Sequence, residues 1–274
     1  MKKIADFIKS NAKQILEVAA LFAVIILPWI VNLQELFKVY IESNSLTPDN
    51  LWWYFALTCG NPIASLILFC ALLLVLRKIN CDYVMNRCYV YHDYCYAWYW
   101  FCAKVLGIKQ CNIILVPIQM QFKLVIRSTF AIYPLEDDDY PVIDNESECN
   151  VAKSHEDAGE STLNLILEDT YIIEEQQISK QNRDVLSIKI SRNNGSNGRH
   201  FSQIFIDSII NVLQEYKWIP VVNVYATTNP KNTLHIARRA FGSMSRGNVG
   251  HLYVFQQQHK EGIRLFERKG HKIF

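Results

Sequence analysis

Residues Leu51–Leu76 read LWWYFALTCGNPIASLILFCALLLVL, and none of them carries a charge. An α-helix needs about 20 apolar residues to cross the hydrocarbon core of a bilayer, so this stretch is long enough for a transmembrane helix. Arg77 and Lys78 end it abruptly. The stretch therefore predicts a membrane-spanning helix, around which the rest of the chain is organised.

A second apolar segment comes earlier in the chain. Ile15–Val31 is almost wholly apolar apart from Glu17, and it follows a basic N-terminal segment. A signal peptide has the same pattern, but Ile26–Trp29 reads ILPW and offers no small-residue cleavage site. We expect an uncleaved first transmembrane helix, and hence a membrane hairpin over residues 1–80.

The charges that flank the two segments predict their orientation. Basic residues lie at the N-terminus and after the second segment, at Arg77, Lys78 and Arg87, whereas the connecting loop Asn32–Asn50 is mainly acidic. Because positively charged flanks stay on the cytoplasmic side, we expect both termini in the cytoplasm and the hairpin in the inner (cell) membrane. Gly60-Asn61-Pro62 would kink the second helix, either to line a channel or to bond a neighbouring helix.

Residues 81–108 combine regularly spaced cysteines with many aromatic residues. Cys81, Cys88, Cys95 and Cys102 recur every seven residues, so on one helix they would lie along one side. We therefore predict a juxtamembrane helix over 81–108 that lies in the lipid headgroup layer or packs against its copies in a homo-oligomer. Metal binding is the alternative, but thiolates spread along a helix cannot form one tetrahedral site, and no metal is predicted.

Residues 109–160 predict strands followed by an acidic linker. Cys111–Val125 alternates apolar and polar residues, which is typical of a strand, and Asn145–Ser161 is polar and acidic. Net charge is −12 over residues 132–184 and +9 over residues 185–274. The basic last third either is shielded by the acidic middle or faces an anionic partner.

From residue 161 onward, strand-like and helix-like patterns alternate. Strands are expected at Leu163–Leu167, Val185–Ile190, Trp218–Tyr225 and Leu252–Phe255, helices at His200–Tyr216 and Asn232–Phe241, and a closing hairpin of Ile263–Phe266 with His271–Phe274 across Lys269-Gly270. This order predicts a cytosolic α/β domain over residues 161–274, Rossmann-like and with a partly parallel sheet. The predicted fold class is therefore a membrane-anchored α/β protein.

Ligands bind to sheets of this kind at the carboxyl ends of the strands, and that rule selects three loops. The candidate ligand-binding residues are Ser191, Arg192, Asn193, Asn194, Gly195, Ser196 and Arg199 in the first loop, Thr227, Thr228, Asn229, Asn232 and Thr233 in the second, and Gln256 in the third. Glycines, helix N-terminal amides and arginines suit a phosphate or another anion. Each loop also has an ordinary structural reading, as a surface turn, a helix cap or a solvated loop.

No sequence motif identifies a reaction. The chain lacks G-x-S-x-G, H-E-x-x-H and a paired Cys/His signature, and few carboxylates follow Asp184 to hold Mg²⁺ near the basic loops. We therefore predict no catalytic residue and no cofactor, and we expect a binding protein rather than an enzyme.

In outline, the layout is similar to bacterial defence effectors that couple a nucleotide-sensing domain to membrane helices. That resemblance implies a sensor or effector in the lipid bilayer whose cytosolic domain binds an anionic small ligand, such as a nucleotide second messenger. Two alternatives stay open. One is a membrane-tethered scaffold that docks protein or nucleic acid on the basic last third, and the other is a phosphoester-processing enzyme.

Overall fold

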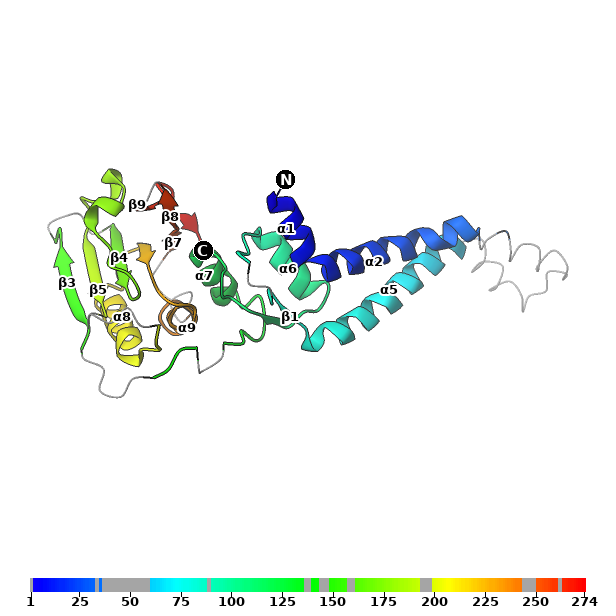
Figure 1. Ribbon diagram of the computed structural model, residues 1–274, viewed down its shortest axis with the longest axis horizontal. Coiled ribbons are helices and arrows are strands. Elements are labelled where there is room, and N and C mark those ends of the chain that lie inside the picture. The colour runs from blue at the N-terminus through cyan, green and yellow to red at the C-terminus, as the bar shows by residue number, and fades with distance from the viewer. Residues whose placement is uncertain are drawn as a thin grey trace. The chain divides into compact units, whose positions relative to one another are not determined.

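The computed structural model describes residues 2–32, 35, 60–87, 90–135, 139–142, 148–156, 161–192, 199–242, 250–260 and 263–274 (Figure 1). The chain divides into two compact units. Met1–Val90 with Trp100–Gln110 forms one, which we call the hairpin unit, and Tyr91–Tyr99 with Cys111–Phe274 forms the other, which we call the sheet unit. This division differs from the boundaries expected from the sequence, because the segment from 91 to 110 contributes to both units.

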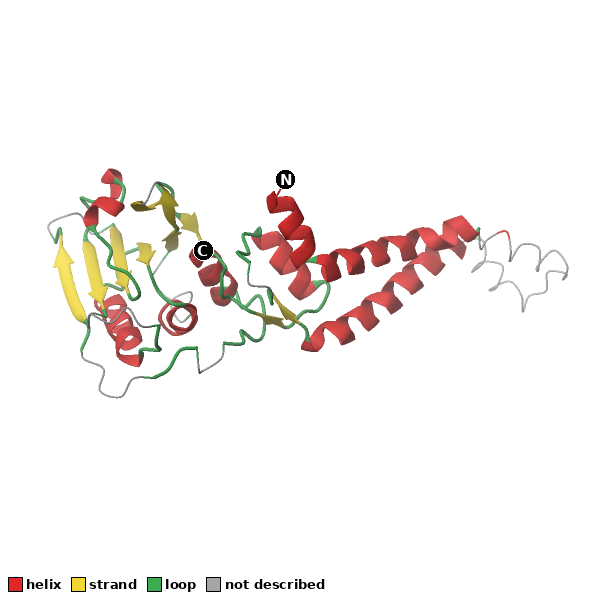
Figure 2. Ribbon diagram, viewed as in Figure 1, coloured by secondary structure: helices red, strands yellow, loops and turns green. Residues whose placement is uncertain are grey.

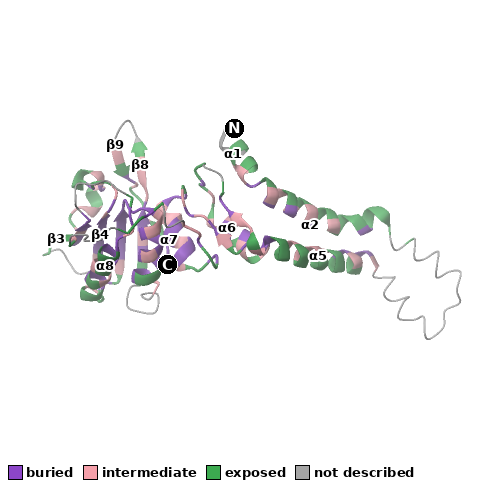
Figure 3. Ribbon diagram, turned by 60° about the horizontal axis from the view of Figure 1, so that its bottom comes forward, coloured by how far each residue is buried: buried purple, intermediate pink, exposed green. Residues whose placement is uncertain are grey.

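The hairpin unit contains two long apolar helices. It includes α1 (Lys2–Ser10), α2 (Ala12–Val31) and α5 (Gly60–Ile79), and α2 packs against α5 (Figure 2). Both α2 and α5 are long and apolar enough to cross a membrane, and many of their large apolar side chains are exposed (Figure 3). The two apolar helices expected from the sequence are thus present. Residues 51–59, and with them the start of the predicted second span, lie outside the described residues, and Gly60–Pro62 open α5.

The long helix predicted over residues 81–108 is wrong. The segment contains η1 (Asn80–Asp82), β1 (Val84–Met85), α6 (Tyr96–Lys104) and the start of β2 (Gln110–Cys111). Asn86 has a φ of 63°, a left-handed conformation that no helix interior allows. The cysteines therefore do not form one stripe, because Cys95 is exposed before α6 whereas Cys102 is buried within it. Aromatic residues, Asn and Asp have weak helix propensity, so the seven-residue spacing did not suffice.

A buried polar cluster closes the base of the hairpin. Asn80 is fully buried, and its Nδ2 donates hydrogen bonds to Oε2 of Glu17 (2.9 Å) and to the carbonyl of Leu106 (3.0 Å). Its Oδ1 accepts a hydrogen bond from Nζ of Lys13 (2.7 Å). Lys13, Glu17 and Asn80, which we call the base cluster, thus tie α2 and the end of α5 to the turn that follows α6.

Six strands form the main sheet of the sheet unit, in the order β10-β7-β6-β4-β5-β3. They are β3 (Asn150–Ser154), β4 (Thr162–Glu168), β5 (Ser187–Ser191), β6 (Val221–Ala226), β7 (His251–Phe255) and β10 (His271–Lys272). Strand β4 pairs in parallel with β5 and β6, and β6 pairs in parallel with β7. The edge strands β3 and β10 are antiparallel to their neighbours, so the sheet is mixed.

Each face of this sheet has its own cover. The helical face carries α7 (Ile118–Ile126), α8 (Gln203–Glu215) and α9 (Pro230–His235), which continues as the π-helical segment η4 (Ile236–Phe241). The other face carries the segment after β4, with η2 (Glu175–Gln177) and η3 (Lys180–Asn182), and the hairpin of β8 (Gln257–Lys260) and β9 (Ile263–Phe266). Because side chains alternate along a strand, Ile166 and Tyr225 face the second cover, where they pack with Ile178 and Phe266.

Three predicted elements of the sheet unit differ from the structure. Cys111–Val125 is not a strand, because Pro117 starts α7 and the buried residues of α7 follow helical spacing. The predicted linker Asn145–Ser161 contains β3. The predicted closing hairpin does not form, because β9 pairs with β8 and β10 pairs with β7. Burial of Phe266 in the core explains that choice of partner for β9.

Candidate ligand-binding site

Three parallel strands end together at one edge of the sheet. Glu168 at the end of β4 lies opposite Ser191 at the end of β5, and Leu167 lies opposite Ala226 at the end of β6. A ligand that binds at this edge would contact the residues that follow these strand ends.

Asp169, the first residue after β4, lies at the centre of a buried polar cluster. Its Oδ1 is 2.7 Å from Nη2 of Arg192, and the two side chains are 0% and 2% exposed. Its Oδ2 accepts hydrogen bonds from the backbone N–H of Asn229 (2.9 Å) and from Nδ2 of Asn229 and of Asn232 (both 3.0 Å). We call these four residues the strand-end cluster, because one carboxylate connects segments that follow three different strands.

The sequence Asn229-Pro230 explains why α9 starts beside Asp169. The side-chain oxygen of Asn229 accepts a hydrogen bond from the backbone N–H of Asn232 (2.9 Å), so the predicted helix cap is confirmed. Pro230 occupies the first helical turn, where its missing N–H costs nothing. The cap thereby fixes the Asn229 amide group, whose Nδ2 also donates to the carbonyl of His200 (2.9 Å) and so connects the start of α9 to the segment that precedes α8.

The charges of the strand-end cluster largely cancel. Burial raises the pKa of the Asp169 carboxyl, against the lowering effects of the Arg192 charge and of the hydrogen bonds from Asn229 and Asn232. A second ion pair joins Lys189 to Glu168, whose other oxygen accepts a hydrogen bond from Ser191 Oγ (3.0 Å). For Arg192 and Lys189, the acidic middle of the chain therefore does shield the basic last third.

The structure brings most of the described candidate residues to this edge. These are Ser191, Arg192, Thr227, Thr228, Asn229, Asn232 and Thr233, all of them buried. Arg199 is exposed and precedes His200. Gln256 is engaged elsewhere, because its Oε1 accepts a hydrogen bond from the backbone N–H of Ile118 at the start of α7 (2.9 Å). Asn193, Asn194, Gly195 and Ser196 lie outside the described residues.

Asp169 is the residue that the sequence reading missed. From the sequence, it entered only the net charge of the acidic middle segment, although it comes two residues after the predicted strand Leu163–Leu167. The rule that selected the loops after the other strands applies equally to the end of this one, and it was the available signal.

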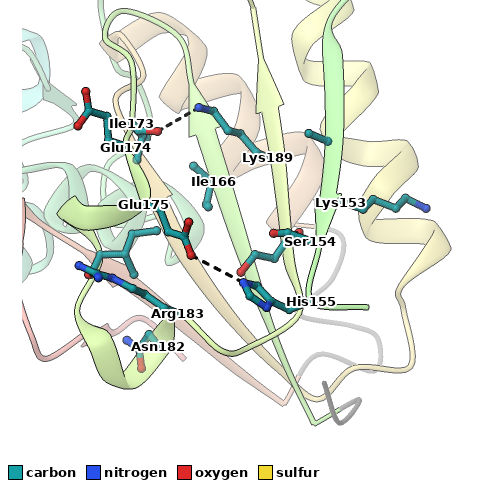
Figure 4. A pocket seen from close by; sticks show the side chains of 13 residues that line it. Lys153, Ser154, His155, Ile166, Ile173, Glu174, Glu175, Asn182, Arg183 and Lys189 are labelled. Carbon is teal, nitrogen blue, oxygen red and sulfur yellow. Dashed lines mark hydrogen bonds and ion pairs between the residues drawn. The ribbon is translucent and has the colours of Figure 1, made fainter. Parts of the chain in front are cut away.

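A separate hollow of about 200 Å³ lies on the face of the sheet opposite the helices, between the strands and the segment around η2 and η3 (Figure 4). Its basic side chains are already engaged: Lys189 donates to the carbonyl of Ile173 (3.0 Å), and Nε2 of His155 is 3.8 Å from Oε1 of Glu175. The lining thus offers both signs of charge and apolar side chains such as Ile166. This hollow is therefore less suited to binding an anion than the strand ends are.

The protein is thus an α/β protein with two candidate membrane spans. Its mixed sheet carries a buried polar cluster at the strand ends. The whole chain, residues 1–274, matches the family described as the SMODS- and Ubiquitin system-associated 2TM effector domain (SUa-2TM), and the chain belongs to that family. No curated protein matches the sequence.

Among solved structures, two of Cap4 from Acinetobacter baumannii, a SAVED/CARF-domain containing receptor, are similar to this chain. The one with the cyclic trinucleotide 3'3'3'-cAAA has a TM-score of 0.43 and 7% identity, and the match covers 65% of this chain and 41% of the receptor. The one with 2'3'3'-cAAA has a TM-score of 0.38 and 6% identity, and covers 57% and 36%. The chain thus spans about two fifths of the receptor's length.

Proposed function

We propose that this chain is a membrane-anchored sensor and effector in bacterial defence signalling. Its sheet unit binds an anionic small ligand, such as a nucleotide second messenger, and its hairpin unit responds to that binding. Membership in a family of two-transmembrane effector domains supports the effector part of this proposal. The exposed apolar helices α2 and α5 support the membrane part.

The observation that carries the ligand part is the donor set around Asp169. A guanidinium, two side-chain amides and a backbone N–H converge on one carboxylate. These are the groups that bind a phosphate oxygen as readily as a carboxylate oxygen. In a Rossmann-like domain, this is also the end of the sheet at which ligands bind. Because Asp169 already engages these donors, we propose that the ligand's phosphate lies beside the strand-end cluster, where the exposed Arg199 supplies positive charge.

Coupling to the membrane would run through α6. This helix contributes Tyr96–Tyr99 to the sheet unit and Trp100–Lys104 to the hairpin unit. In the sheet unit, Tyr99 is fully buried and its ring packs edge-on against Phe130. In the hairpin unit, the carbonyl of Lys104 accepts a hydrogen bond from Nη1 of Arg77 (2.8 Å). A ligand shifts such packing only if it binds one arrangement more tightly than the other. We propose that the packing of α6 differs between the two arrangements, within a homo-oligomer.

The test uses the full-length chain in detergent micelles and a panel of linear and cyclic nucleotides. A ligand at 100 times its Kd stabilises the folded state by about 2.7 kcal/mol, so a binding nucleotide raises the melting temperature measurably. Arg199→Gln should weaken the shift, whereas Lys217→Gln, which removes an exposed charge elsewhere in the sheet unit, should not. Arg192→Ala is a poor probe, because it would leave the Asp169 carboxylate buried without its partner.

Two results would count against this function. If no nucleotide shifts the melting temperature, the sheet unit has no ligand of this class. If DNA or RNA binds instead, with an affinity that falls steeply with salt, the scaffold alternative gains support.

A further inference from the structure

Away from the strand-end cluster, three cations gather where α7 and η4 pack together. Nζ of Lys123 lies 5.2 Å, and the guanidinium carbon of Arg127 lies 5.0 Å, from the centre of the Tyr96 ring. The guanidinium carbon of Arg238 lies 5.5 Å from the centre of the Tyr133 ring. We call these five residues the cation cluster.

Backbone carbonyl groups hold Arg127 and Tyr133 in place. Nε and Nη2 of Arg127 both donate to the carbonyl of Ile273 (3.2 and 2.8 Å), which fixes the plane of the guanidinium. The hydroxyl of Tyr133 donates to the carbonyl of Leu124 (2.7 Å), and Tyr133 is buried. Arg127 and the Tyr133 ring are therefore oriented before any anion arrives, which lowers the entropic cost of binding one.

The positive charge of the cluster is not compensated within the described parts of the chain. There, no carboxylate forms an ion pair with Lys123, Arg127 or Arg238, whereas the adjacent Arg239 pairs with Asp207 (3.1 Å). Burial lowers the pKa of Lys123, and the neighbouring charge of Arg127 lowers it further. Like charges held together without a counterion are destabilising, and an arriving anion relieves that repulsion.

We infer that the cation cluster is a second anion site, which binds a phosphate group. Lys123 and Arg127 lie over the same ring, and an ammonium beside a guanidinium matches the oxygens of a phosphate; Arg238, over the Tyr133 ring, adds positive charge. Because the cations already lie against the tyrosine rings, the cluster recognises a phosphate rather than stacking on a base. The phosphate belongs either to the headgroup of an anionic phospholipid or to a soluble ligand.

The experiment uses the full-length chain and a triple variant, Lys123→Gln, Arg127→Gln and Arg238→Gln. A matched control, Lys180→Gln, Lys217→Gln and Arg268→Gln, removes the same charge from exposed positions elsewhere in the sheet unit. In one arm, titration calorimetry at low salt measures the binding of inorganic pyrophosphate in detergent. In the other, mass spectrometry measures phosphatidylglycerol retained from nanodiscs of mixed phosphatidylglycerol and phosphatidylcholine.

The wild type and the control should bind in at least one arm, and the triple variant should bind about tenfold more weakly or worse there. The responding arm identifies the source of the phosphate. Binding in neither arm, or equal binding by the wild type and the triple variant, overturns the inference. If circular dichroism shows that the triple variant is unfolded, Lys123→Gln alone replaces it, and unchanged binding by that variant overturns the inference. Failure here appears as equal pyrophosphate and lipid binding by the wild type and the triple variant, whereas failure at the strand ends appears as the absence of any thermal shift with nucleotides, so the two failures are distinguishable.

Discussion

The hairpin unit and the sheet unit each enclose a polar cluster built on a pair of opposite charges, but the two pairs are enclosed to different degrees. In the base cluster, Lys13 and Glu17 lie 3.6 Å apart, and the lysine side chain is 35% exposed. In the strand-end cluster, Arg192 and Asp169 lie 2.7 Å apart, and neither side chain is more than 2% exposed. A partly hydrated pair opens at low cost, whereas an enclosed pair resists the loss of either member. The comparison indicates that the hairpin base is the more readily rearranged of the two.

The two units also use their apolar residues differently. On α2 and α5, side chains such as Phe22 and Leu66 are each 63% exposed, whereas in the sheet unit residues such as Leu165 and Val224 are fully buried. Exposed apolar surface on this scale needs a partner, and lipid is the partner that suits two long apolar helices. The same kind of residue thus forms a protein core in one unit and the exposed surface of two candidate membrane spans in the other.

Breaking the enclosed pair should have the largest effect. Asp169→Ala removes the buried carboxylate that Arg192 and three hydrogen-bond donors share, so the folded sheet unit should lose about 3–5 kcal/mol. Thermal melting of the full-length chain in detergent measures this loss. As a control, Asp207→Ala breaks the exposed pair with Arg239 and should cost less than about 1 kcal/mol. Equal and small losses in both variants would remove the contrast between enclosed and exposed pairs.

Disrupting the base cluster should have an intermediate effect. Asn80→Leu removes the donor to Glu17 and to the carbonyl of Leu106, which should cost about 1–3 kcal/mol and accelerate hydrogen exchange around residues 104–108. Ser65→Ala is the comparison, because it removes one neutral hydrogen bond, to the carbonyl of Ile25, from the middle of the same helix pair. Exchange around 104–108 that rises equally in both variants would argue against a specific role for Asn80.

A backbone substitution at the same base should cost somewhat less. Gly107 has a φ of +77°, and an added Cβ would lie 2.9 Å from Cγ of Arg77. Gly107→Ala should therefore destabilise the hairpin unit by about 1–2 kcal/mol, seen as a lower melting temperature. At Gly60, an added Cβ would meet nothing within 4 Å, so Gly60→Ala should be neutral or stabilising. A melting temperature unchanged by Gly107→Ala would show that this turn is not constrained.

The smallest expected effect is a pH dependence of the sheet unit. Burial lowers the pKa of His235, and the charges of Arg238, Arg239 and Lys231 lower it further. The folded state therefore holds His235 neutral at a pH at which the unfolded chain, with a histidine pKa of about 6.5, already binds a proton. The contribution of neutral His235 to the free energy of unfolding should be fully present above about pH 6.5 and should decline as the pH falls below that value. His235→Phe should flatten the decline, and an identical pH profile for wild type and variant would refute the assignment.

Several elements could be predicted from sequence, because their signals are local. The strand Leu163–Leu167 lies within the observed Thr162–Glu168, and the cap at Asn229 follows from Asn-Pro before a helical pattern. The alternation in Cys111–Val125 and the cysteine spacing in 81–108 were equally local but gave the wrong elements. Burial around α7, and turn residues such as Asn86, decided those segments instead.

The strand-end cluster shows why a site is harder to predict than a strand. Asp169 and Asn229 are 60 residues apart in sequence, and only the pairing of β4 with β6 brings them together. The strand-end rule selected the residues directly after β5 and β6, which do lie together, and also Gln256, which does not; it could not show that a carboxylate of the chain itself would engage Arg192. The choice of β8 as the partner of β9 is similarly non-local, because it depends on the burial of Phe266.

The most direct test of the whole account is hydrogen exchange of the full-length chain in nanodiscs, with and without the nucleotide that gives the largest thermal shift. We predict protection in residues 199–202 and 227–233, which follow β5 and β6 in the sequence, together with altered exchange in α6 and in residues 104–108 at the hairpin base. Unchanged exchange in the sheet unit, or protection confined to that unit while the hairpin base exchanges as before, would contradict the claim that ligand binding in the sheet unit acts on the hairpin unit.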